Sequence, residues 1–331
     1  MRRILPPKLT MRPNSERRVL PWGELPRGTR PFDGLVIVDK PAGVTSHDVV
    51  GAMRRLAGTR HVGHAGTLDP MATGVLCVGV GRATKLLQYV TGTNKEYTAT
   101  IRLGIETSTE DADGEVTAVH GIGALGPASS WRGAIEQAMA HFTGTIEQVP
   151  SSVSAVKVNG RRAYERVRAG EHVTLPARRV TVSRFALEDA PHEVMDGAAV
   201  EVDVAVTVSS GTYVRALARD VGQRLGTGAH LTRLRRTRVG AWDEGRAVTI
   251  ESLAGVVSAG GELPHVTVSE VCVALFPIVT VTEEQAEELR HGQFIDASRP
   301  HGEPPYAAMC GNVAVALVSA RAGKLKPDLQ V

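Results

Sequence analysis

The chain has 331 residues, enough for one large domain with a small second one, or for two domains of medium size. Hydrophobic residues at 42% and charged residues at 22% exclude a mostly disordered chain, and no apolar run approaches the roughly 20 residues of a membrane-spanning helix. The net charge is only +3, so the distribution of charge along the chain is more informative than its sum.

The first 33 residues are rich in proline and arginine and have no hydrophobic periodicity. They carry eight basic and three acidic side chains, whereas the rest of the chain is close to neutral. This composition predicts a flexible leader over residues 1–33. The leader lacks the apolar stretch of a signal peptide, which favours a cytoplasmic protein. Its role and its true start stay open, because Met11 is a second possible initiation site.

The first elements after the leader are a strand, a helix and a second strand. Residues 35–38 predict a short buried strand, and Ser46 then caps a helix that ends at Gly58. Apolar residues fall on one face of this helix, so it is expected to pack on a core. After a loop broken by glycines, residues 75–80 again predict a strand and residues 84–90 a short helix.

The middle of the chain holds the clearest periodicity. Alternating apolar and polar residues predict strands over residues 95–103 and 200–208, the second with valine at every second position. Between them, residues 117–130 are typical of a loop, and a helix follows. A further amphipathic helix is expected to begin after Gly211 and to end at Gly226.

The last third of the chain predicts a linker and a small domain. Glycine-rich residues 255–265 are typical of a linker, here between a large domain of residues 34–260 and a small one of residues 270–331. In the small domain, Thr282 and Gln285 have the spacing of a helix capping box. Strands and helices mix without a regular βαβ rhythm along the whole chain, which predicts an α+β fold.

Arginines gather in three places beyond the leader. The clusters are Arg161, Arg162, Arg166 and Arg168, then Arg178 and Arg179, and then Arg233, Arg235, Arg236 and Arg238. Clustering on a near-neutral background is typical of a face that binds polyanions. One cluster alone is better explained as a solvated surface, but three together favour a nucleic-acid partner.

Signatures of common cofactors are absent, and no cofactor is expected. Residues 79–84 lack the third glycine of a dinucleotide loop, and no glycine loop precedes a phosphate-binding lysine. His61 and His64 lack nearby carboxylates or cysteines, so no metal site is expected there. Three scattered cysteines argue against a disulfide framework. A metal-dependent hydrolase would need more ligands than these histidines and Cys77 offer.

One loop stands out for its composition. Residues 63–74 contain three glycines and a proline within twelve residues. Such a loop constrains the backbone, which is the usual way to hold one side chain in an exposed and fixed pose. Asp69 is the only acid in the loop and is therefore the candidate for chemistry, although an Asp-Pro pair on its own is also a common start of a turn.

This loop resembles the catalytic motif of the TruB family of pseudouridine synthases, which modify the T loop of tRNA. The resemblance covers roughly residues 34–240 and includes further motifs in the expected order. These are Asp39-Lys40-Pro41, Lys95-Glu96-Tyr97, Glu110–Gly114, Ser154–Lys157, Gly211–Arg215, Gly228–His230 and Leu234–Arg236. The chain departs from the family at Pro150-Ser151-Ser152, where two prolines are usual, and this affects loop rigidity rather than chemistry.

The resemblance implies a fold and an activity. The expected fold is a pseudouridine synthase core with a mixed or antiparallel central sheet flanked by helices. An RNA-gripping insertion is implied near residues 144–180, and a small PUA-like β domain in residues 270–331. The implied reaction isomerises a T-loop uridine after the base is flipped into a pocket. The implied partner is the tRNA T stem-loop, and we expect a monomer without metal, cofactor or membrane attachment.

The resemblance also implies roles for single residues. Asp69 would be the nucleophile, kept ionised by an ion pair with Arg215. Tyr97 would stack on the flipped base and could also accept a proton. The implied substrate contacts are His64, Tyr213 and Leu234, and the implied supports of the catalytic loop are Lys40 and Pro41.

Several alternatives stay open at the level of sequence. Asp69 could attack C1′ of the ribose or C6 of the uracil. A non-catalytic RNA-binding or tRNA-chaperone protein would keep the basic clusters and Tyr97, but it would not need both Asp69 and Arg215, whose presence favours the enzyme. The sequence leaves undecided which other RNAs are substrates and whether the small domain is needed for activity.

Overall fold

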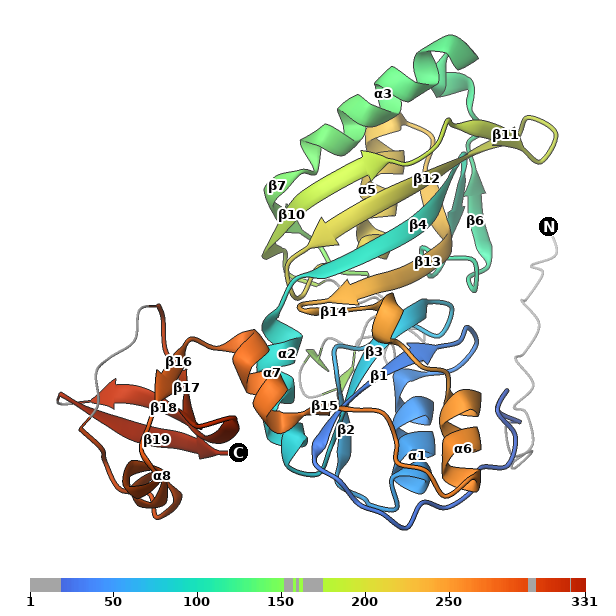
Figure 1. The fold of residues 1–331 in the computed structure, drawn as a ribbon. Coiled ribbons are helices and arrows are strands. Elements are labelled where there is room, and N and C mark those ends of the chain that lie inside the picture. Colours follow the sequence, from blue (N-terminus) through green and yellow to red (C-terminus); the bar gives the residue numbers. More distant parts are fainter. Residues whose placement is uncertain (1–18, 152–156, 159–160, 163–174, 297–301, 322) are drawn as a thin grey trace.

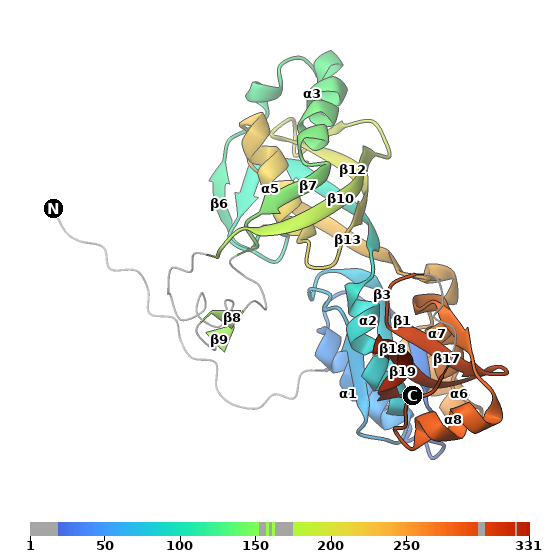
Figure 2. The ribbon, with the colours of Figure 1, turned by 90° about the vertical axis from the view of Figure 1, so that its left-hand side faces the viewer.

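A computed structural model describes residues 19–151, 157–158, 161–162, 175–296, 302–321 and 323–331 of the chain. Two lobes share one large sheet, and a small third part stands beside the lower lobe (Figure 1). Figure 2 shows from the side that the small part lies against the lower lobe and away from the upper one. Within the described ranges, none of the helices combines the length and the apolar character that a bilayer crossing requires.

An 11-stranded sheet runs through both lobes. Its main path contains, in spatial order, β15 (Val266–Thr267), β1 (Gly34–Lys40), β3 (Thr73–Val80), β13 (Ala229–Val239), β4 (Lys95–Leu103), β12 (Ala199–Val208), β10 (Arg178–Leu187) and β7 (Gly144–Gln148). Neighbours on this path are antiparallel except β13 and β3, which are parallel. The prediction of an α+β fold with a mixed central sheet is therefore confirmed.

Helices cover both halves of this sheet. In the upper lobe α3 (Ala128–His141) packs on α5 (Val214–Leu225), and in the lower lobe α1 (Ser46–Leu56) packs on α6 (Ile250–Ser258) (Figure 1). The other short elements are β2 (Val62–Ala65), η1 (Gly81–Leu86), α2 (Leu87–Gly92), β5 (Ile105–Thr107), β6 (Val116–Val119), η2 (Gly123–Leu125), β8 (Lys157–Val158), β9 (Arg161–Arg162), β11 (His192–Val194), β14 (Trp242–Asp243) and η3 (Glu244–Arg246).

Local sequence explains why the main elements form. The alternate valines of β12 are all buried, as a strand with one face on a core requires. Helix α5 ends at Gly226, whose φ of 71° is the left-handed conformation that glycine adopts most easily. Helix α1 is capped by Thr45 and not by the predicted Ser46, because Thr45 and Asp48 form a reciprocal capping box.

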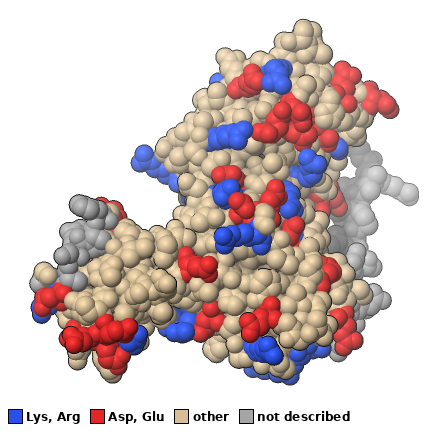
Figure 3. All heavy atoms as spheres, viewed as in Figure 1, with Lys and Arg blue, Asp and Glu red and all other residues tan. Residues whose placement is uncertain are grey.

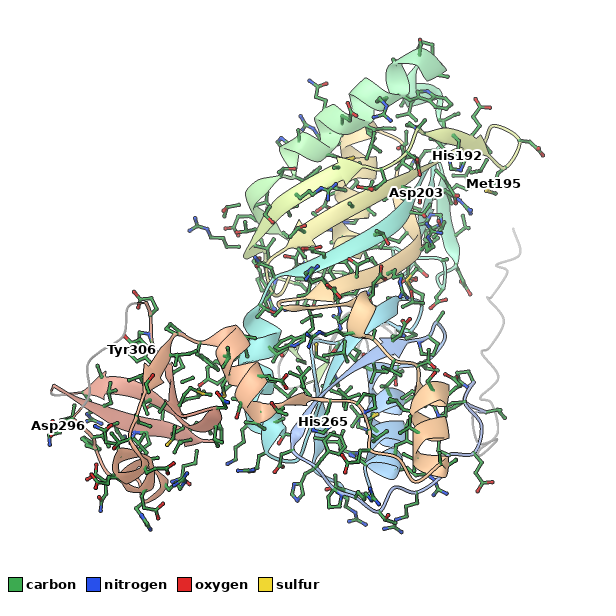
Figure 4. All side chains as sticks on the ribbon, in the orientation of Figure 1. His192, Met195, Asp203, His265, Asp296 and Tyr306 are labelled. Carbon is green, nitrogen blue, oxygen red and sulfur yellow. The ribbon has the colours of Figure 1, made fainter. Side chains whose placement is uncertain are left out.

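The C-terminal part is a four-stranded sheet with one helix. Its strands follow the order β16 (Ile278–Thr280), β17 (Tyr306–Cys310), β18 (Val313–Arg321) and β19 (Lys324–Gln330), with α8 (Glu283–Arg290) packed on it. Tyr306 is fully buried there (Figure 4). The capping box of Thr282 and Gln285 at α8 is present as predicted. Through α7 (Val268–Leu275), apolar residues of this sheet share a core with β1, β3 and α2.

The described part of the expected leader is not flexible. Trp22 and Leu25 are buried in the main core beside α1. The ring of Phe32 stacks on His265, with ring centroids 4.5 Å apart, at the entry to β15 (Figure 4). The prediction of a leader over residues 1–33 is therefore wrong for residues 19–33, because a few apolar residues among the prolines suffice to dock the segment. The rest of the leader lies outside the described residues.

Two expected loops contain helix and strand. The predicted linker at residues 255–265 is helical up to Ser258, since α6 is anchored by the buried Ile250 and Leu253 and its glycine lies where no other atom crowds it. The predicted loop at residues 117–130 contains most of β6 and the start of α3. In both places, small residues weaken the apolar pattern from which a helix or strand is predicted. Packing on neighbouring elements stabilises the element that forms there.

Candidate active site

The loop of residues 63–74, called the catalytic loop below because it resembles the catalytic motif of the family, is held by hydrogen bonds before and after Asp69. Ser46 Oγ accepts a hydrogen bond from Leu68 N at 2.8 Å and donates one to Leu68 O at 3.1 Å. On the other side, Ala72 N donates to Asp69 O at 3.1 Å. A methyl group at Gly74, whose φ is 98°, would stand 2.2 Å from the Arg236 carbonyl, so only glycine fits. The loop therefore presents the Asp69 side chain on a backbone with little freedom.

Lys40 lies fully buried behind this loop. Its ammonium donates to Val44 O at 2.8 Å, to Pro41 O at 2.9 Å and to Pro70 O at 3.3 Å. The turn after β1 is thereby tied to the residue that follows Asp69. This geometry suits the supporting role expected of Lys40 and Pro41.

Asp69 faces an arginine from a different element. Arg215 Nε lies 2.8 Å from Asp69 Oδ2, and the arginine side chain is 3% exposed whereas that of Asp69 is 35% exposed. Arg215 also donates to Thr109 O at 2.6 Å and to Ser151 Oγ at 3.1 Å. Because α5 starts at Val214, the guanidinium is held by the first turn of that helix. A buried cation with this many fixed contacts orients the carboxylate of Asp69.

A second carboxylate takes part in this network. Asp111 Oδ2 lies 3.4 Å from Arg215 Nε, and Asp111 is almost fully buried. Burial raises the pKa of Asp111, against the lowering effects of the Thr109 hydroxyl and the Arg215 charge. Burial alone would lower the pKa of Arg215, but the charges of Asp69 and Asp111 outweigh it and raise that pKa. The guanidinium therefore stays charged between two acids.

Asp69 and Arg215 open onto a cavity of about 270 Å³. This volume lies just below the range of about 300–1,000 Å³ that is usual for pockets holding small ligands. Tyr97 from β4, Leu234 from β13 and Tyr213 line it with them. The backbone of Tyr213 is fixed by the buried Gln148, which accepts from Tyr213 N at 2.8 Å and donates to its carbonyl at 3.1 Å.

The structure thus brings five of the eight expected site residues to one cavity and leaves Lys40 and Pro41 behind its catalytic loop. His64 lies on β2 and is not among the residues that line the cavity. Burial, and then the charges of Arg236 and His47, lower the pKa of His64. Its Nδ1 is buried and has no partner among the described residues.

Four further residues belong to this site. They are Lys95, Asp111, Ser151 and Arg236. Three of them lie inside motifs that the sequence singled out, and Ser151 lies in the stretch where the chain departs from the family. No spacing pattern shows that these residues meet Asp69 or Arg215. Among the described residues, no group of three or more histidine, cysteine or acidic side chains is placed to share a metal ion.

The arginine cluster on β13 is largely neutralised from within the fold. Arg235 donates to both oxygens of Asp39 at 3.0 and 3.1 Å, and Arg238 lies 3.0 Å from Asp243. Arg233 lies 3.5 Å from Asp203, which Figure 4 labels on β12. Lysine, arginine and acidic side chains are mixed over the middle of this face (Figure 3). Three of the four arginines of this cluster are therefore paired with acidic side chains within the fold.

Of the other two arginine clusters, only the one on β10 has described side chains. Arg178 and Arg179 are exposed at the start of β10. The first cluster falls in a segment whose side chains lie outside the described residues. Among the arginine clusters whose side chains are described, the β10 pair is the one in which every arginine is exposed.

Two solved structures from H/ACA ribonucleoproteins have the same fold as this chain. A chain of an H/ACA RNP bound to a substrate RNA containing 2'-deoxyuridine matches with a TM-score of 0.65 and 25% identity, over 90% of this chain and 84% of that chain. A chain of the archaeal box H/ACA sRNP Nop10-Cbf5 complex matches with a TM-score of 0.64 and 25% identity, over 90% and 85% of the two chains.

Family models define the class of protein, which is a pseudouridylate synthase. The model of the TruB family pseudouridylate synthase N-terminal domain matches residues 54–214, and that of the tRNA pseudouridylate synthase B C-terminal domain matches residues 215–265. The tRNA pseudouridine synthase B of Arthrobacter sp. (strain FB24) is 53% identical over 307 residues, which cover 90% of this chain and 96% of that protein. The protein of that name from Thermobifida fusca (strain YX) is 50% identical over 305 residues, 89% and 97% of the two chains. The chain belongs to the TruB family of pseudouridylate synthases, and it is an enzyme.

Proposed function

We propose that the protein converts one uridine in the T loop of tRNA to pseudouridine, with Asp69 as the nucleophile. The observation that carries the proposal is the ion pair of Asp69 with the buried Arg215 at the edge of a cavity walled by Tyr97. The two relatives described above, which are 53% and 50% identical to this chain, are named tRNA pseudouridine synthase B. The T loop as the target rests on the motif resemblance.

The reaction needs a carboxylate and a place to turn the base. The bond between N1 and C1′ breaks, the uracil rotates, and C5 bonds to C1′ in place of N1, after which C5 loses its proton and N1 gains one. No electrons are gained or lost overall, so the isomerisation needs no redox cofactor. Asp69 must be ionised to attack, and the Arg215 guanidinium places a positive charge 2.8 Å from its carboxylate. Its 35% exposure leaves the carboxylate accessible to the nucleotide.

The base has to leave the RNA stack to reach Asp69. Extrusion costs about a few kcal/mol, and stacking on an aromatic ring returns about 1–3 kcal/mol. Tyr97 is 9% exposed on the cavity wall, so its ring is available to a base that enters the cavity but not to bulk solvent. We assign Tyr97 to stacking and Tyr213 and Leu234 to the walls around the uracil.

Recognition of the tRNA arm follows from the properties of folded RNA. Folded RNA offers few readable base edges, so shape and phosphate contacts supply most of the affinity. We assign these contacts to the expected insertion near residues 144–180 and to the domain of residues 270–331, in a monomer acting in the cytoplasm. Helix α8 of that domain carries four glutamates and one arginine, so the RNA should approach another face.

The direct test is product mapping on tRNA. Purified protein is incubated with an unmodified tRNA transcript, with an isolated T stem-loop and with unstructured oligouridine, and any pseudouridine is located. One modified T-loop position in the first two, and none in the third, is expected. Asp69→Asn should abolish turnover and keep tRNA binding, while Asp113→Asn at an exposed acid should change neither. Multiple turnover by Asp69→Asn would refute the assignment of the nucleophile.

A further inference from the structure

Two buried cations line the same cavity as Asp69. Lys95 is the first residue of β4 and Arg236 lies on β13, and these residues are only 5% and 1% exposed. Both are among the residues that line the cavity, and Asp69 is the one acid among the described residues that do so. Asp69 is already paired with Arg215.

Neither cation has a carboxylate partner among the described residues. Lys95 Nζ donates to the carbonyl of Thr91, in the last turn of α2, and to that of Thr93, the C-cap residue of the helix. Arg236 donates to Val75 O at 2.7 Å and more weakly to the carbonyls of the catalytic loop, at 3.1 and 3.5 Å. Carbonyl dipoles offset part of the cost of burying a charge, but they leave the full positive charge in place.

The register of the sheet places both cations around the stacking residue. Lys95 and Tyr97 are two positions apart on β4, so their side chains leave the same face of the strand. Arg236 is the direct neighbour of Tyr97 across the pair of β4 and β13. A methyl group at Gly66 would stand 3.6 Å from Arg236 Nη1 and 3.8 Å from Lys95 Cε, so this one glycine faces both side chains.

Burial of two neighbouring positive charges is costly unless a negative charge arrives. Burial, and then the charge of Arg236, lower the pKa of Lys95 to about 8. The other titratable group that acts on Lys95 is the thiol of Cys77, which burial keeps neutral because its pKa is raised to about 12. The protein itself thus supplies no anion for this wall of the cavity.

The proposed reaction brings a negative charge to this wall of the cavity, whichever carbon Asp69 attacks. If the bond between N1 and C1′ breaks first, N1 keeps the bonding pair and the charge spreads to O2 and O4 of the uracil. If the carboxylate adds to C6, the π electrons of the C5–C6 bond move through the ring to O4. In both routes negative charge develops on the base, and fixed positive charge around it lowers the barrier.

We propose that Lys95 and Arg236 form a cationic wall that stabilises the negative charge on the uracil ring while its bond to the ribose is broken. This rests on the proposed function, because it needs a uridine in the cavity. The wall is distinct from the Asp69–Arg215 pair, which positions the nucleophile. Lys95 is the better residue to test, since Arg236 also holds the catalytic loop.

The test compares Lys95→Met with Lys85→Met, an exposed lysine that donates to Gln330 O far from the cavity. Single-turnover rates on the T stem-loop, RNA affinity and melting temperature are measured for each. We expect Lys95→Met to react about 100-fold more slowly, as for the loss of one preorganised donor, with RNA affinity within threefold of wild type. Lys85→Met should match wild type. A Lys95→Met rate within threefold of wild type overturns the proposal.

A second measurement covers the case in which Lys95→Met does not fold. The wild-type kcat/KM should fall as pH rises above about 8, because the Lys95 pKa is lowered to about that value and the neutral amine stabilises no anion. Lys95→Arg should stay level over the same range on the same RNA. Identical pH profiles for the two enzymes overturn the proposal. If wild-type enzyme forms no pseudouridine in any tRNA, the proposed function fails instead, and that result precedes any comparison of variants.

Discussion

The side chain of Arg215 is almost completely buried, yet its Nε meets the accessible carboxylate of Asp69 at 2.8 Å. The arginine is held by Thr109, Ser151 and Asp111 as well, so its position does not depend on Asp69. In this ion pair the cation is held in place by its other contacts, and the carboxylate is positioned by a loop whose backbone is constrained by glycines. Such an arrangement needs no rearrangement at the moment of attack, which is the physical meaning of preorganisation.

Arg215→Lys tests whether this fixed geometry matters beyond charge. An ammonium cannot reproduce the planar fork that contacts Asp69, Thr109 and Ser151 at once. We expect the single-turnover rate on the T stem-loop to fall by about 100-fold, as for a lost preorganised donor, and the melting temperature to fall as well. Arg224→Lys, in the exposed last turn of the same helix, serves as the matched control. A rate for Arg215→Lys equal to wild type would show that charge alone suffices.

Tyr97 separates stacking from proton transfer. Stacking needs only the π face, whereas a general base needs a phenolic oxygen whose ordinary pKa of about 10 suits neutral operation poorly. If stacking alone matters, Tyr97→Phe retains most activity and Tyr97→Leu loses about 5- to 150-fold, the equivalent of about 1–3 kcal/mol. Single-turnover rates of both variants on one stem-loop decide the point. A Phe variant as inactive as the Leu variant would assign the role to the hydroxyl.

The sequence predicted elements well where one face of a regular element is apolar. Strand β12 with its alternating valines and helix α5 with its terminal glycine lie where the pattern places them. Strand β13 escaped notice because four arginines interrupt its alternation. Arg235 pairs with Asp39, which is 196 positions away, and Arg238 pairs with the nearby Asp243, whereas Arg236 contacts only backbone carbonyls among the described residues. Only the folded sheet shows which of these charges have acidic partners.

The candidate site likewise has one part that the sequence predicted and another that only the folded structure shows. Its glycine loop marked Asp69, but the partner Arg215 lies 146 positions away and was expected only from the family resemblance. Lys95 and Arg236 stood in quoted motifs without a role, because their shared cavity depends on the pairing of β4 with β13. Spacing along a chain carries no information about which charges remain uncompensated after folding.

Acid should destabilise the protein through two histidines, the buried His230 and the half-buried His64. Burial lowers the pKa of both His64 and His230, so the unfolded chain binds protons at a higher pH than the folded one. The contribution of these two histidines to the free energy of unfolding is fully present above the pKa of an unfolded histidine, about 6.5, and is lost as pH falls below that value. Asp111, whose pKa burial raises, acts with the opposite sign.

Comparison of variants isolates the histidine effect. Urea unfolding at pH 7.5 and pH 5.5, under otherwise equal conditions, gives the loss of unfolding free energy on acidification. His64→Leu should lose less than wild type, whereas His61→Leu, at an exposed position, should lose as much as wild type. An unchanged loss in His64→Leu would contradict the assigned cause.

Two glycines with different surroundings provide the last prediction. At Gly74 an added methyl group would stand 2.2 Å from the backbone oxygen of Arg236, on a φ of 98° that side chains disfavour. Gly51 lies inside α1 with no atom within 4 Å of an added methyl group. Gly51→Ala should therefore raise the free energy of unfolding by up to about 1 kcal/mol, the difference in helix propensity. Gly74→Ala should lower it and should also slow catalysis, because β13 and the catalytic loop meet at this contact. Urea unfolding and single-turnover rates measured on both variants check this, and a Gly74→Ala protein with wild-type stability and rate would show that the loop tolerates the shift.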